Sequence, residues 1–187
     1  MMPRRSITAR SALLALVYFF IDLCLLRRKP QELPASPALF GLVLAVAVLG
    51  GLLLSVTAGA SLMSGLGQTL LDLLLMLGVL HVALKALKKD ARYLQTATAL
   101  VGADAVVGFV ALLPVSLARP VAEGADPGGD MLLAGLLFLA LVAWSVLVVG
   151  HILRHAFDLT LAQGVVIAIA FDVFSYVVIG ALTQGSV

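Results

Sequence analysis

Three aspartates stand inside long apolar stretches of the sequence, where an ionised side chain is costly. Asp72, Asp104 and Asp172 each have leucine, valine or alanine residues on both sides. A charge at the centre of a membrane-spanning helix costs at least about 2.5–3.5 kcal/mol on insertion scales. We therefore expect these side chains to face the interior of a helix bundle, either with polar partners or in protonated form.

The chemistry of these acids depends on their depth and on their neighbours. Asp104 and Asp172 fall near the middle of their apolar segments and could meet at one depth, whereas Asp72 lies nearer the outer end of its segment. No lysine or arginine stands at the depth of Asp104 and Asp172, so hydrogen-bonded or protonated acids are favoured over salt bridges. Polar residues one helical turn away are candidate partners: Gln68 and Thr69 for Asp72, and Ser175 and Tyr176 for Asp172.

Two interpretations of the three acids remain open. They could form a path for protons or cations, a common role of acids inside a membrane. They could instead make interhelical hydrogen bonds that fix the packing, at about 1 kcal/mol per contact. The sequence favours packing, and it leaves Asp72, Asp104 and Asp172 as a candidate ion site.

Two histidines lie one helical turn apart, at His151 and His155, and Asp158 follows three residues later. This spacing is compatible with metal binding if the helix continues that far. The glutamate of a His-Glu-x-x-His motif is missing, because Ile152 holds its place. Asp158 is expected in the turn after the helix. His151 and His155 are therefore weak metal candidates, and no cofactor is predicted.

Small residues recur at every fourth position of the first long apolar segment. They are Ala47, Gly51, Ser55 and Gly59. A stripe of this kind lets a second helix approach closely. We favour packing within the bundle, and the alternative is a contact between two copies of the chain.

The sequence lacks the motifs that mark common enzyme classes. It has no phosphate-binding glycine loop followed by Lys-Ser/Thr, no Gly-x-Gly-x-x-Gly after a strand and no Gly-x-Ser-x-Gly elbow. The single cysteine, Cys24, excludes an intramolecular disulfide. The basic loop at residues 85–92 is too short for a nucleic-acid surface and suits lipid headgroups. We predict a protein that is not an enzyme and does not bind nucleic acid.

The elements that position these residues follow from the composition. The chain has 187 residues, of which 62% are hydrophobic and only 12% charged, and its mean hydropathy is +1.15. Soluble domains carry about 25% charged residues, so much of this surface must face lipid. About 20 apolar residues in a helix cross a hydrocarbon core of roughly 30 Å. Five such spans are predicted, at residues 38–58, 67–87, 93–115, 131–153 and 161–182.

Residues at the ends of these segments are typical of helix caps. Ser36 followed by Pro37 predicts the start of the first span. Asp130 is expected to cap the fourth span, after the Pro-Gly-Gly turn that precedes it. Thr160 and Gln163 have the spacing of a capping box at the start of the fifth span.

A further apolar segment, residues 11–26, is too short to span, because its 16 residues make a helix of roughly 24 Å. A narrow stripe of polar and small residues favours a helix that lies in the membrane interface. Asp22 and the basic residues 27–29, without a small-residue cleavage site behind them, argue against a cleaved signal peptide. The chain thus divides into an N-terminal basic, amphipathic interfacial helix (residues 1–30) and an all-α, five-span transmembrane bundle (residues 31–187).

The distribution of basic residues predicts the orientation. If the N-terminal helix stays on the cytoplasmic surface, eleven of the twelve lysines and arginines face the cytoplasm, and Arg119 alone lies outside. This is the positive-inside pattern. We expect a bacterial inner-membrane protein with its N-terminus in the cytoplasm and its C-terminus outside.

The C-terminal half resembles the Ypt-interacting (YIP) family of small membrane proteins. The similar stretches are ARYLQT (91–96), LVGAD (100–104), AW (143–144) with HILRH (151–155), and FDLT (157–160). The resemblance implies a compact five-helix bundle. Eukaryotic members are associated with Rab-type GTPases and vesicle trafficking. This chain has a short N-terminal helix in place of their long cytosolic segment, so it is more similar to the bacterial branch. The resemblance brings no catalytic residues.

The leading functional hypothesis is a membrane scaffold that binds lipids, another membrane protein or a second copy of itself. It rests on the lack of catalytic motifs, on the small-residue stripe and on the resemblance. The alternative is a small proton- or cation-coupled transporter or channel that uses Asp104 and Asp172. A metal-dependent membrane enzyme at His151 and His155 is the weakest of the three hypotheses.

Overall fold

A computed structural model describes residues 9–118 and 128–184 of the chain, and all regular structure in these residues is helical. The predicted all-α class is therefore confirmed. The α-helices are α1 (Ala9–Cys24), α2 (Pro37–Thr57), α3 (Leu62–Ala86), α4 (Tyr93–Leu117), α5 (Gly129–Phe157) and α6 (Leu161–Gln184). Two single-turn 3₁₀ helices join them, η1 (Pro30–Glu32) before α2 and η2 (Asp90–Arg92) before α4.

Helices α2 to α6 are long and apolar enough to cross a membrane, with mean hydropathies between 1.8 and 2.8. They match the five predicted spans, with shifted ends. Helix α3 begins five residues early, because Ser61 caps it by accepting a hydrogen bond from the backbone N–H of Ser64. Helix α5 continues four residues beyond the prediction, to Phe157. The architecture is that of a multi-pass membrane protein.

Two of the predicted caps are confirmed. Ser36 accepts a hydrogen bond from the N–H of Leu39, 3.3 Å away, at the start of α2. At the start of α6, the Thr160 N–H donates to the Gln163 side chain over 3.0 Å, and the Gln163 N–H donates to the Thr160 hydroxyl over 3.3 Å. This reciprocal pair is a capping box.

The predicted cap at Asp130 is wrong. The cap of α5 is Gly128, in an extended conformation, and Asp130 lies inside the first turn. The helix begins two residues earlier than expected because Gly129 already has helical geometry. Asp130 still suits this position, since a negative charge in the first turn interacts favourably with the helix dipole.

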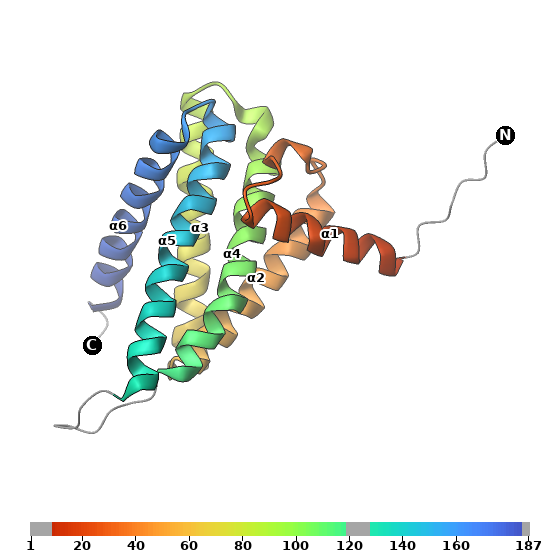
Figure 1. Cartoon of the computed structure of the whole chain (residues 1–187). Helices are drawn as coiled ribbons and strands as arrows, with labels where there is room; N and C mark the ends of the chain where they lie inside the picture. The colour runs from red at the N-terminus through yellow and green to blue at the C-terminus, as the bar shows by residue number, and fades with distance from the viewer. Residues whose placement is uncertain (1–8, 119–127, 185–187) are drawn as a thin grey trace.

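Helix α4 lies between α2 and α5, and these two helices are its main neighbours (Figure 1). Its first half is almost completely buried, from Thr96 to Ala103. Most of the buried residues are alanine, glycine or threonine, which let neighbouring helices approach closely. The small side chains of α4 therefore place it at the centre of the bundle.

Helices α5 and α6 approach each other closely at a pair of glycines. A Cβ atom on Gly164 would collide with the backbone carbonyl oxygen of Gly150, and one on Gly150 would come within 2.8 Å of the backbone nitrogen of Val165. Backbone atoms cannot move aside as a flexible side chain can. Glycine at both positions is therefore a steric requirement of this helix pair.

The small-residue stripe of α2 packs mainly inside the bundle. A Cβ on Gly51 would lie 2.7 Å from the Thr69 side chain of α3, and Ser55 lies against Gly65 of α3. Ala47 is 2% exposed. Gly59 is different, because it lies beyond the end of α2 with φ +90° and has open space around it.

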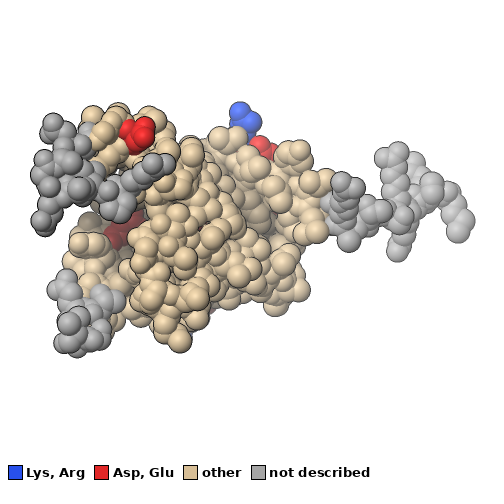
Figure 2. Space-filling view, turned by 90° about the horizontal axis from the view of Figure 1, so that it is seen from below, with Lys and Arg blue, Asp and Glu red and all other residues tan. Residues whose placement is uncertain are grey.

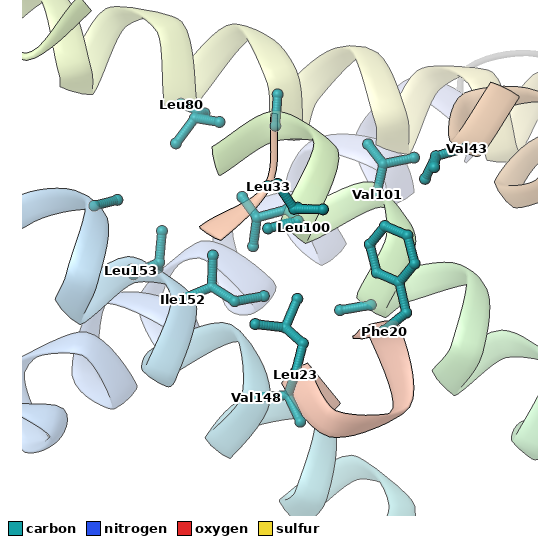
Figure 3. Close-up of a cluster of buried hydrophobic side chains, with 14 of the residues drawn as sticks. Phe20, Leu23, Leu33, Val43, Leu80, Leu100, Val101, Val148, Ile152 and Leu153 are labelled. Carbon is teal, nitrogen blue, oxygen red and sulfur yellow. The ribbon is translucent and has the colours of Figure 1, made fainter. Parts of the chain in front are cut away.

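Helix α1 runs crosswise to the five long helices and meets the bundle with its C-terminal end (Figure 1). The Phe20 ring packs directly onto Gly102 of α4, where no Cβ would fit. Phe20 and Leu23 join the same buried cluster as Val101 of α4 and Val148 of α5 (Figure 3). The outward face of α1 is mostly apolar, apart from Tyr18 and the partly exposed Asp22.

Hydrogen bonds hold the segment after α1 along α5 and α4. They connect it to successively later turns of α5, so the chain returns toward the end of the bundle at which α2 begins. From α5, Trp144 Nε1 donates to the Cys24 carbonyl over 2.9 Å, and His151 Nε2 bonds to the Arg28 carbonyl over 2.9 Å. One turn later, the His155 carbonyl accepts from Gln31 Nε2 over 2.6 Å. From α4, Gln95 Nε2 donates to the Leu33 carbonyl over 2.8 Å.

A cluster of ion pairs joins the α3–α4 connection to the C-terminus of α5. Asp158 accepts from Arg92 over 2.8 Å and pairs with Lys89 over 3.0 Å, and Lys89 also donates to the Phe157 carbonyl. These two cations lie at the negative end of the α5 dipole. Hydrogen bonds from Arg92 and Lys89 hold the pKa of the Asp158 carboxyl below its usual range. We call this end of the bundle, with its lysines and arginines, the basic end.

The close contact of α5 and α6 can be tested at Gly164. We expect Gly164→Ala to lower the free energy of unfolding by about 1–3 kcal/mol, because its Cβ would push against the backbone of Gly150. The matched control is Gly135→Ala in α5, where the added methyl has open space and helix propensity favours alanine by about 0.5–1 kcal/mol. Unfolding in detergent would measure both, and equal stabilities of the two variants would contradict the prediction.

The ion-pair cluster predicts a defined pH dependence. Because the folded pKa of Asp158 is lowered, its stabilising effect is complete above its ordinary value of 3.8 and disappears as the pH falls through the folded value. Asp158→Asn should be less stable than wild type at neutral pH, and this difference should vanish below about pH 4. Asparagine tolerates the left-handed φ of 59° at this position. Unfolding curves across pH would measure the difference, with Asp90→Asn at the same end as control.

Candidate functional site

A cavity of about 810 Å³ lies between helices α3, α4, α5 and α6. It exists because α6 packs along α5 and makes only a short contact with α3. Helices α4 and α5 form its floor, and α3 and α6 form its walls. Its polar lining residues are Gln68, Asp72, Asp104, Ser145, Asp172, Ser175 and Tyr176.

The structure brings all three intramembrane aspartates to this cavity. Asp72 comes from α3, Asp104 from α4 and Asp172 from α6. Asp72 and Asp104 also line a second, smaller pocket that reaches α2. Sequence spacing alone suggested a meeting of Asp104 and Asp172. The cavity adds Asp72 to these two.

Ser175 joins the two walls of the cavity. Its hydroxyl donates a hydrogen bond of 2.8 Å to the Asp72 carboxylate, so it connects α6 to α3. The Ser175 side chain is buried, at 5% exposure. The sequence placed Ser175 beside Asp172 on the same helix, and it placed Gln68 and Thr69 beside Asp72. The observed partner comes from another helix, which a local pattern cannot show.

Asp104 and Asp172 have no hydrogen-bond partner among the described residues. Asp104 is exposed to the cavity. Asp172 is also exposed at the cavity wall. Among residues 9–118 and 128–184, no lysine, arginine or histidine lines the cavity. The acids of the site are therefore open to a ligand, and no basic residue of the described lining neutralises them.

The cavity is closed at the basic end and open at the other. Toward the basic end it stops at tightly packed side chains, among them Leu80, Leu153 and Phe157, each no more than 8% exposed. Toward the opposite end, Tyr176 of the lining is 80% exposed. Figure 2 looks at the bundle from that opposite end and shows acidic atoms recessed behind uncharged side chains.

The two histidines take part in a different interaction. Their rings meet edge to face with centroids 4.8 Å apart, and His151 Nε2 bonds to the Arg28 carbonyl. Within residues 9–118 and 128–184, no group of three or more His, Cys, Asp or Glu side chains is arranged to hold a metal ion. His151 therefore anchors the segment after α1, and His155 packs against its ring.

Comparisons with family models, with curated proteins and with solved structures give no match for this chain.

The link between Ser175 and Asp72 can be tested by removing the hydroxyl. Ser175→Ala should lower the free energy of unfolding by about 1 kcal/mol, because α3 and α6 lose a shared hydrogen bond. Ser145→Ala is the matched control. Ser145 also lines the cavity, but its hydroxyl bonds to the Val142 carbonyl of its own helix. Detergent unfolding should show a loss for Ser175→Ala alone, and a loss of the same size in both variants would refute the link.

Proposed function

We propose that this protein is a small membrane transport protein that binds a cation or protons at Asp72, Asp104 and Asp172. The observation that carries the proposal is the convergence of three acids, from three helices, on one cavity whose described lining contains no basic residue. In an apolar surrounding, neighbouring carboxylates cannot all be ionised without compensation. The site must therefore hold protons or bind a positive charge.

This electrostatic condition provides a mechanism for coupled binding. A cation that enters the cavity replaces protons on the carboxylates, and protons that return expel the cation. Asp72 is central to this exchange, because it lines the cavity together with Asp104 and Asp172 and accepts the hydrogen bond from Ser175 that connects α6 to α3.

The asymmetry of the cavity fits one state of an alternating-access cycle. By the positive-inside rule, the basic end faces the cytoplasm, so the open end faces outside. Release to the cytoplasm would need the packed side chains at the basic end to separate. The ion pairs of Asp158 with Lys89 and Arg92 lie above these side chains and would have to loosen as well.

The scaffold hypothesis loses one of its supports. Ala47, Gly51 and Ser55 were its candidate surface for a partner helix, and they pack within the bundle. The resemblance to the YIP family still favours a non-enzymatic membrane protein, with lipid or protein partners. We rank transport first because the acid-lined cavity is a defined site.

A flux assay tests the proposal. In liposomes with an imposed proton gradient, wild-type protein should dissipate the gradient faster than empty liposomes, and Asp104→Asn and Asp172→Asn should reduce this rate at least about tenfold. Asp130→Asn is the control, because this aspartate lies in the first turn of α5 and not in the cavity lining. Background flux in wild type and all variants would rule out transport. Equal detergent unfolding curves would show that the variants are folded.

A further inference from the structure

The geometry points to an organic cation with an apolar body as the ligand of this cavity. The charged group would lie among Asp72, Asp104 and Asp172, and the apolar body would extend toward the basic end. The inference deepens the proposed transport function and rests on it for the role of the acids. Three properties of the cavity support it: its volume, the spacing of the acids and the division of its lining into polar and apolar parts.

The volume is much larger than an inorganic ion requires. About 810 Å³ lies within the range of roughly 300–1,000 Å³ that is typical of pockets for drug-sized molecules. A metal cation is held instead by six to eight oxygen ligands at about 2.3–2.6 Å, or by fewer at shorter distances. A cavity of this size therefore suits a ligand with a substantial body.

The acids surround a space without forming a chelating group. Asp72, Asp104 and Asp172 all belong to the described residues, and no set of three carboxylates among these residues is close enough to hold a metal ion. All three nevertheless line the same cavity. This spacing fits a positive group that is larger than a bare ion, such as an ammonium with its substituents.

The part of the cavity between the acids and the basic end is wholly apolar, whereas the outer part mixes polar residues with Val107, Val177, Ile179, Gly180 and Ala181. On α3, Gln68 and Asp72 precede a wholly apolar stretch of lining that runs toward the basic end. Helices α4 and α6 start at the basic end and α5 ends there, so the early lining residues of α4 and α6 and the late lining residues of α5 lie in this same deep part. These residues are also apolar. The deep part is lined by Met76, Val79, Leu80, Ala83, Leu100, Ala103, Val148, Val149, Leu153, Phe157, Ile167 and Phe171.

This division determines the orientation of a ligand. An apolar body gains free energy when it leaves water for the deep part, at roughly 25 cal/mol per Å² of buried surface. A cationic group at its end would then lie at the level of the acids, where the part of the lining that the structure describes carries no basic side chain. A proton or a small hydrated ion would make no use of the apolar part.

Binding of tetraphenylphosphonium to the full-length protein in nanodiscs of neutral lipid tests the inference. This probe is an apolar cation, and nanodiscs without protein correct for its partition into lipid. We expect saturable binding that Asp104→Asn weakens at least about tenfold, since one attractive charge is lost in a low-dielectric site. Asp130→Asn, outside the cavity, should bind as wild type does. The inference would be overturned if wild type showed no saturable binding, or if Asp104→Asn bound the probe as tightly as wild type does.

A second variant tests the apolar part on its own. Ala83→Phe would fill the deep end of the cavity without changing any acid. It should abolish binding of tetraphenylphosphonium, and detergent unfolding at the wild-type midpoint would show that the variant is folded. Binding that is unaffected by Ala83→Phe, or by Asp104→Asn, would overturn the inference. If wild type carried protons but did not bind the probe, the inference about the ligand would be overturned and the transport proposal would stand. If wild type bound the probe saturably but carried no protons, only the transport proposal would be refuted.

Discussion

An acid inside an apolar bundle has to be shielded from lipid, and the packing around helix α4 satisfies this requirement. Helices α2 and α5 cover two sides of α4, and α1 covers a third with Phe20 on Gly102. The remaining side carries Asp104 and faces the cavity. The small side chains of α4 permit close packing on the covered sides, and the cavity lies on the side of Asp104.

The cavity depends on an unequal attachment of α6. The glycine pair Gly150 and Gly164 draws α6 tightly onto α5, and the contact with α3 is short and includes the hydrogen bond from Ser175 to Asp72. Close backbone contact on one side and a polar bridge on the other keep α6 away from the floor formed by α4. Dense helix packing and an open acid-lined site are therefore compatible within one bundle.

The two ends of the bundle have different roles. At the basic end, polar contacts accumulate: Lys89 and Arg92 bind the C-terminus of α5, and the segment after α1 is held along α5 by side-chain hydrogen bonds. These contacts satisfy backbone carbonyls that helix ends leave unpaired. The opposite end has no comparable cluster among the described residues, and there the cavity is open. At the basic end, polar contacts therefore connect the loops to the helix termini.

The sequence alone determined the helices, since length, hydropathy and the caps at Ser36 and Thr160 depend on neighbouring residues. It also identified Asp72, Asp104 and Asp172 as candidate site residues, because an acid within an apolar helix can be recognised without knowing which way its side chain points. The tertiary structure decided what these residues contact. Ser175 pairs with Asp72 across two helices, and His151 anchors a backbone carbonyl 123 residues away. Such contacts depend on how helices rotate and approach one another, which no local spacing encodes.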